Sequence, residues 1–168
     1  LNEDLRYLKA IQNFENGSKI SGIKQLTYLA QDSTETGLMY RRKLGMWYLQ
    51  EGLFDKAVSY FKLAGDGASA EVLTDNNFES HLSLKQLQEA GEYLQLEINE
   101  DSYLNLYQKA PFNPYLLNDI ADFLVGKGRE AEAYQMVFDA LEFNEKSITL
   151  WKKYVHLALK NGVPYYAD

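Results

Sequence analysis

The feature that most constrains the fold of this chain is a helix–turn–helix pattern that returns at a fixed interval. A helical pattern of apolar residues runs from Leu38 to Gln50, Gly52 ends it, and a second helical stretch follows up to Gly65. Similar units begin at Asp4, Leu38, Pro114 and Ile148. These starts lie 34, 76 and 34 residues apart, and the long gap equals two intervals plus an insertion of eight residues. Because a fixed period of this kind marks stacked repeats, the sequence predicts an all-α fold built from helical hairpins.

The second unit carries the residues of a known repeat at that repeat's own positions. Counted from Leu38, these are Leu44-Gly45, Tyr48, Gly52, Ala57, Phe61 and Ala64. The chain therefore resembles the tetratricopeptide repeat (TPR) family, whose unit is a 34-residue helical hairpin. Arg41, at the fourth position, departs from the family pattern. The unit that starts at Pro114 follows the pattern with Leu117, Ile120-Ala121, Leu124, Gly128, Ala133, Val137 and Ala140.

The resemblance implies a right-handed α–α superhelix, or solenoid, formed by a single array over residues 1–168. About 4.5 repeats with roughly 9–11 helices are expected. The approximate repeats are 4–37, 38–71, 72–113, 114–147 and 148–168. The last repeat is truncated, and it follows the pattern through Trp151, Tyr154-Val155, Ala158, Gly162 and Ala167.

The third expected repeat, 72–113, is the least regular part of the chain and carries the insertion. The stretch Thr74-Asp75-Asn76-Asn77 has poor helix propensity, and it stays open whether the helix before Asn76 belongs to the first or the second half of this unit. A break is predicted over Asn99–Ser102, with Asp101 or Ser102 as the cap of the helix that follows. This repeat is therefore expected to be degenerate.

Small residues explain physically why two helices of one unit can pack closely. They let the helix axes approach to about 8–10 Å, and in the second unit they are Gly45, Ala57 and Ala64. Gly52 and Gly128 supply the helix-ending backbone conformation, and Asn16-Gly17-Ser18 fits the turn of the first hairpin. Phe61 is predicted to fill the space between hairpins, so its replacement by alanine should cost about 3–5 kcal/mol.

Composition excludes several classes of protein. A hydrophobic content of 46% with 13 Tyr and 8 Phe excludes a disordered chain. The absence of Cys excludes disulfides, thiolate metal sites and a cysteine nucleophile. The net charge of −7 argues against direct nucleic-acid binding, and no apolar run approaches the ~18 residues of a membrane span. The chain starts with Leu1, so we expect a piece of a longer protein, which we take to be bacterial. No targeting signal is present, and this leaves open whether the protein is cytoplasmic or periplasmic.

The sequence carries no recognisable catalytic or metal-binding pattern. His81 and His156 are the two histidines, and neither has an acidic residue four positions away, so both are expected to be surface or groove residues. Gly126-Lys127-Gly128 lacks the spacing of a phosphate-binding loop and fits a turn between helices. We therefore predict a protein that is not an enzyme and needs no cofactor or metal.

The TPR resemblance implies a binding surface on the concave face, which the first helix of each pair lines. The positions that carry over are Met39, Arg42, Lys43, Met46, Tyr115, Asn118, Asp122, Lys152 and His156. Cations mixed with adaptable apolar side chains suit an extended or helical peptide that carries some acidic residues. The alternative is that Arg41-Arg42-Lys43 and Lys152-Lys153 are solvated helix faces with no specific role.

The leading functional hypothesis is a non-catalytic scaffold or adaptor that binds a protein or peptide segment. Two alternatives stay open. Trp151 and Tyr154 resemble the half-a-TPR repeat of RNA-processing scaffolds, and the chain could also regulate an enzyme located elsewhere in the parent protein. The truncated last repeat exposes the apolar side of Trp151 to Ala158, so self-association through this end is expected.

Overall fold

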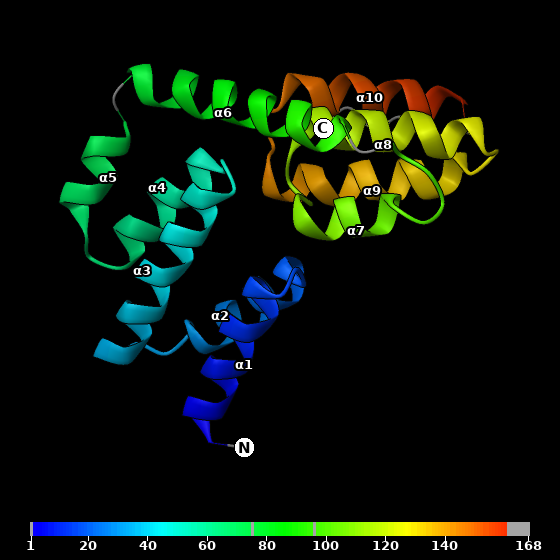
Figure 1. Cartoon of the computed structure of the whole chain (residues 1–168). Coiled ribbons are helices and arrows are strands. Elements are labelled where there is room, and N and C mark those ends of the chain that lie inside the picture. Colours follow the sequence, from blue (N-terminus) through cyan, green and yellow to red (C-terminus); the bar gives the residue numbers. More distant parts are fainter. Residues whose placement is uncertain (1, 75, 96, 161–168) are drawn as a thin grey trace. The chain divides into compact units, whose positions relative to one another are not determined.

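The fold is all-α, as the sequence predicts. A computed structural model describes residues 2–74, 76–95 and 97–160, and every regular element in these ranges is an α-helix. The helices are α1 (Glu3–Glu15), α2 (Lys19–Leu29), α3 (Glu35–Gln50), α4 (Phe54–Leu63), α5 (Gly67–Leu73), α6 (Asn76–Leu94), α7 (Tyr103–Lys109), α8 (Pro114–Gly126), α9 (Glu130–Phe143) and α10 (Ile148–Lys160) (Figure 1). Residues 161–168, with Gly162 and Ala167 of the last expected repeat, lie outside the described ranges.

The chain divides into two compact units, residues 1–85 and 86–168, and the boundary falls within α6. In the first unit, α1 packs against α2, α3 packs against α4, and α2 also contacts α3. The rings of Phe14 and Trp47 stack with their centroids 4.1 Å apart, and those of Tyr7 and Tyr40 lie 5.0 Å apart. These contacts join α1 to α3, so the two hairpins are packed on each other.

Glycines allow the close packing within the two hairpins of the first unit. A Cβ atom on Gly45 would lie 3.1 Å from the ring of Phe61, which is buried as predicted. A Cβ atom on Gly22 would lie 2.7 Å from the carbonyl oxygen of Ala10. The two helix backbones therefore approach each other at a point where no side chain fits.

The helix starts agree with the sequence at two hairpins and differ slightly at another. Helices α8 and α10 begin at Pro114 and Ile148, as predicted. Helix α3 begins at Glu35 rather than at Leu38, because the Thr34 hydroxyl accepts a hydrogen bond from the amide of Gly37 (3.4 Å) and caps the helix there.

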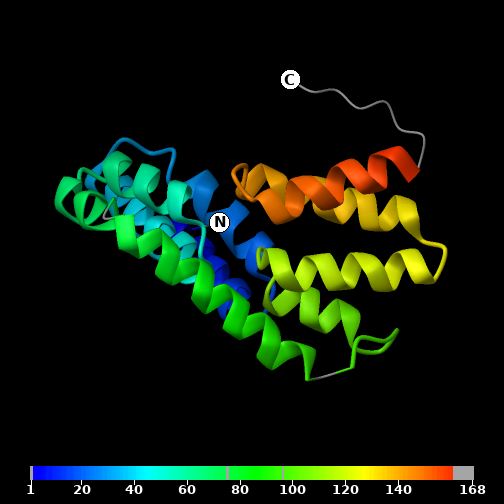
Figure 2. The same cartoon turned by 90° about the horizontal axis from the view of Figure 1, so that it is seen from above.

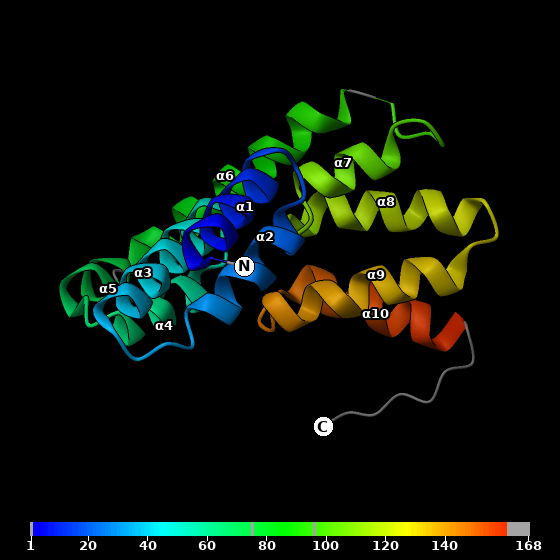
Figure 3. The same cartoon turned by 90° about the horizontal axis from the view of Figure 1, so that it is seen from below.

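In the second unit, α8, α9 and α10 pack on one another, and α7 contacts α8. Figures 2 and 3 show the yellow to red helices α8 to α10 lying side by side. The core between them includes the fully buried residues Leu116, Leu117, Ile120, Leu124, Val137, Leu150 and Leu157. Asn113 caps α8 through its side-chain oxygen, and its amide donates to the Gln86 carbonyl at 2.8 Å. One buried side chain thus joins α8 to the end of α6 that belongs to this unit.

The region of the degenerate repeat differs from the expectation in where its first helix begins and in how the turn before the next helix is held. Helix α6 begins at Asn76, so the poor helix propensity of this stretch does not prevent a helix of 19 residues. The turn before α7 is organised by Asn99, whose side-chain oxygen accepts hydrogen bonds from the amides of Asp101 (2.9 Å) and Ser102 (3.0 Å). Ser102 is the N-cap residue of α7, one of the two predicted positions, but its hydroxyl donates to the Glu97 carbonyl (2.6 Å) and forms no cap bond to α7.

Candidate functional site

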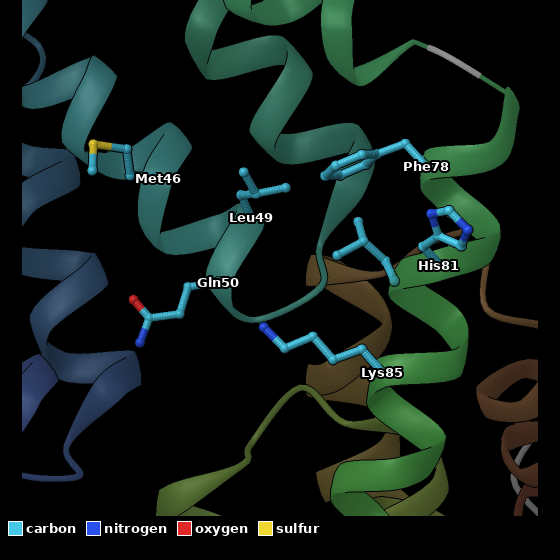
Figure 4. A pocket seen from close by; sticks show the side chains of 7 residues that line it. Met46, Leu49, Gln50, Phe78, His81 and Lys85 are labelled. Atoms are coloured by element: carbon cyan, nitrogen blue, oxygen red, sulfur yellow. The ribbon is translucent and has the colours of Figure 1, made fainter.

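The first unit contains an open groove between α3 and the part of α6 before residue 86. It has a volume of about 520 Å³ and is called the α3–α6 groove here. Its walls are Met46, Leu49, Gln50, Phe78, His81, Leu82 and Lys85. Figure 4 shows the α3 side chains on one side and the α6 side chains on the other, with Phe78 and Lys85 reaching toward α3.

The periodicity of buried and exposed residues along α3 explains why Met46 lines this groove while its neighbours do not. Leu44, Trp47 and Tyr48 face the hairpin core, with at most 4% of each exposed. Met46 lies between them in sequence and therefore points to another side of the helix, where it is 51% exposed. An apolar side chain with this exposure provides contact area that no neighbouring residue covers.

Helix α6 contributes the opposite wall by the same periodicity. Phe78, His81, Leu82 and Lys85 follow the spacing of one helix face. Leu82 is buried, and the ring of Phe78 lies 6.4 Å from that of Phe54 on α4, which anchors this end of α6 to the hairpin. His81 is exposed at the groove, which agrees with its predicted place.

A second hollow lies on the other side of Met46 and is called the α1–α3 hollow here. It has a volume of about 410 Å³ and is lined by Phe14, Glu15, Lys19, Lys43, Met46, Trp47 and Gln50. Met46 and Gln50 therefore line both spaces, which meet along α3. A ligand that lies across Met46 would contact the two hollows together.

The lysines of the two hollows differ in their electrostatic state. The Lys19 ammonium forms an ion pair with Glu51 at 2.6 Å, so its charge is compensated. Lys43 lies over the face of Trp47, with its nitrogen 5.9 Å from the ring centroid. Within the described parts of the chain, neither Lys43 nor Lys85 forms an ion pair with a carboxylate. These two cations are available to a bound anion.

The predicted residues of α3 separate into two groups. Met46 and Lys43 line the hollows, whereas Met39 is exposed (47%) but lies outside both. Arg42 pairs with Asp66 at 3.5 Å, at the turn before α5. Hydrogen bonds from the hydroxyl and amide of Ser69, with the charge of Arg42, hold the pKa of the Asp66 carboxyl below its usual value of 3.8.

The alternative that the whole basic run on α3 is solvated does not hold for Arg41. Its guanidinium donates to the carbonyl oxygens of Ala30 (2.9 Å) and Asp32 (3.2 Å), at the end of α2 and in the following loop. A third contact reaches the Leu63 carbonyl at 3.4 Å. Arg41 therefore connects α3 to the ends of α2 and α4, which explains a large polar residue at the one position that departs from the TPR pattern.

The other predicted residues belong to the second unit and do not line these hollows. Tyr115 packs against the core, and the Asn118 amide donates to Asp119 at 3.4 Å. Asp122 forms an ion pair with Lys153 at 2.6 Å, so its charge is compensated. Lys152 and His156 are exposed on α10.

The end of the second unit shows what surrounds the Trp151 side chain. Its indole nitrogen donates to the Glu145 carbonyl at 2.6 Å, and its ring meets that of Tyr154 edge to face. Trp151 is 40% exposed, whereas Ala158 is fully buried. Only part of the predicted self-association surface is therefore exposed, and both self-association and the RNA-scaffold alternative stay predictions.

The α6 wall of the groove was missed by sequence reasoning. Its residues lie in the stretch treated as a degenerate repeat, where the TPR positions give no register. The signal that could have found them is the spacing of Phe78, Leu82 and Lys85, which is that of a single helix face.

The described residues contain no group of three or more His, Cys, Asp or Glu side chains placed to hold a metal ion. None of the helices in these ranges combines the length and apolar character needed to cross a bilayer. No protein-family model, curated protein or solved structure matches the chain.

Proposed function

We propose that this chain is a non-catalytic protein–protein interaction module built of TPR-like helical hairpins, and that the α3–α6 groove binds a peptide segment of a partner protein. The observation that carries the proposal is the groove itself. It is open, its walls are mainly apolar, and exposed Met46 lies where it meets the α1–α3 hollow.

The position of the groove in the hairpin order supports the proposal. Helix α3 is the first helix of the second hairpin, and the TPR resemblance implies that first helices line the binding face. Met46 and Leu49 present flexible apolar side chains, which adapt to the side chains of a bound segment. Grooves between helices bind peptide segments through a few apolar anchors in this way.

Two aspartate substitutions on α3 test the proposal. A peptide is first selected on the intact chain from an unbiased display library, and its Kd is measured by fluorescence polarisation. Met46→Asp places a charge between the two hollows, and we expect it to weaken binding by at least about tenfold. Met39→Asp is the matched control, because Met39 is on the same helix with 47% exposure but outside both hollows.

The control is expected to change the Kd by less than about twofold. Circular dichroism of both variants checks that the helices are retained. The proposal is wrong if the library yields no specific peptide, or if the two substitutions weaken binding equally.

A further inference from the structure

The charges around the two hollows indicate what kind of segment they bind. The chain as a whole has a net charge of −7, so a cationic ligand would be attracted to most of its surface. The hollows differ from this average, because Lys43 and Lys85 lack carboxylate partners among the described residues. Glu15 is the acidic residue on the wall of the α1–α3 hollow, while Glu51 compensates Lys19.

The two available cations lie in different hollows, separated by apolar surface. Lys43 lines the α1–α3 hollow and Lys85 lines the α3–α6 groove. Met46 belongs to both spaces, and the groove continues from it along Leu49 to Phe78. A ligand that covers this surface therefore meets a cation, then apolar side chains, then a second cation.

We propose that the bound segment is an acidic peptide in which acidic residues flank a large apolar side chain, and this inference rests on the function proposed above. The apolar side chain lies against Met46, Leu49 and Phe78. The flanking carboxylates pair with Lys43 on one side and Lys85 on the other. The exposed lysines add modest energy at the surface, so they select the ligand mainly by rejecting cationic segments.

The same observations favour a peptide over a nucleic acid. A polyanionic backbone is bound through a dense row of Lys and Arg contacts along its phosphates. Two cations separated by apolar side chains provide too few phosphate contacts for such a ligand. An acidic and apolar segment uses both parts of the surface.

Three synthetic peptide pools test the charge preference. Each pool has a fixed central Leu or Phe and randomised small residues, and the flanking positions are all Glu, all Gln or all Lys. We expect the Glu pool to bind at least about fivefold tighter than the Gln pool and the Lys pool to bind weakest. The preference should disappear when the salt concentration is raised from about 0.1 M to about 1 M.

Charge reversal then locates the preference. The double variant Lys43→Glu with Lys85→Glu should bind the Lys pool better than the Glu pool. Lys24→Glu is the matched control, since Lys24 is an exposed lysine on α2 outside both hollows, and it should keep the original order. Circular dichroism checks that the variants are folded.

The outcomes separate this inference from the proposed function. Equal binding of all pools, still weakened by Met46→Asp, overturns the acidic preference and leaves the peptide-binding module standing. A preference that survives the double reversal also overturns it, as does tighter binding of poly-uridine RNA or anionic vesicles than of the Glu pool. If no pool binds and the unbiased library also yields nothing, both proposals fail.

Discussion

Replacing Gly22 by alanine tests whether α1 and α2 cross as closely as the fold requires. The added Cβ atom would lie 2.7 Å from the Ala10 carbonyl oxygen and 2.8 Å from the Cβ and amide nitrogen of Phe14. None of these atoms can rotate away, because all belong to the backbone or are fixed to it. Since non-bonded heavy atoms are optimally about 3.5 Å apart or more, the helices must separate by about 0.8 Å.

Two opposing terms set the size of the effect. Overpacking a well-filled interior costs about 1–3 kcal/mol, and the separation loosens contacts around the buried Ile23 and Leu26. Alanine in place of glycine within a helix contributes about 0.5–1 kcal/mol in the other direction. We expect the steric term to dominate, so that the free energy of unfolding of the first unit falls by about 1–2 kcal/mol.

Urea unfolding followed by Trp47 fluorescence measures this change, because Trp47 stacks on Phe14. The chain has two tryptophans, so a Trp151→Phe background makes the signal specific to the first unit. Gly91→Ala, followed by far-UV circular dichroism, is the control, since nothing lies within 4 Å of its added Cβ atom and α6 should gain stability there. If Gly22→Ala stabilises the protein as Gly91→Ala does, the close crossing of α1 and α2 is refuted.

Two further predictions concern buried polar groups. Asn113→Asp keeps the side-chain oxygen that caps α8, but it replaces the amide that donates to the Gln86 carbonyl with a carboxylate close to Glu89. We therefore expect urea unfolding at neutral pH to show a free energy of unfolding that is lower by about 1–3 kcal/mol. The loss should shrink on acidification, because a protonated carboxyl can donate again; wild-type stability at neutral pH would contradict this. Burial and the hydrogen bond to Glu3 raise the pKa of Tyr40 from 10.0 to about 12. The stabilisation of the folded state by the protonated Tyr40 hydroxyl is therefore complete below pH 10 and is lost as the pH rises toward 12. The stability difference between wild type and Tyr40→Phe should therefore decrease over this interval, and a difference that stays constant would show that the hydroxyl is not held in this way.

The sequence predicts the hairpins well because short-range rules determine them. Pro114 and Ile148 start helices where the interval places them, and Gly52 and Gly128 end helices with positive φ angles of 76° and 73°. Buried Phe61 packs against the small residue Gly45, as the pattern requires. Periodicity and helix-ending residues act within a few positions, so they can be read without knowing what packs next to them.

Only one wall of the α3–α6 groove could be predicted from the sequence, because the other wall depends on how α6 packs after the second hairpin. The positions of Met46 and Lys43 on α3 follow from the hairpin register. The α6 residues do not, because α6 starts at a weak helix-forming stretch and is held by a tertiary contact of Phe78 with Phe54. The ion pairs could not be predicted either. Nothing in the local sequence indicates that Arg42 forms an ion pair with Asp66, or that Lys43 forms none with a carboxylate of the described residues.

Helix α3 separates the residues that stabilise the first unit from those that we propose to bind. Arg41 and Leu44 act inside the protein, the first through backbone hydrogen bonds and the second through full burial. Lys43 and Met46 line the hollows, and Met46 is 51% exposed there. Substitution of Lys43 or Met46 should therefore change binding with little change in the free energy of unfolding, whereas loss of Arg41 should do the opposite. A surface that can change without unfolding its helix can acquire a new ligand preference by single substitutions, which is what a recognition module built on a repeated scaffold requires.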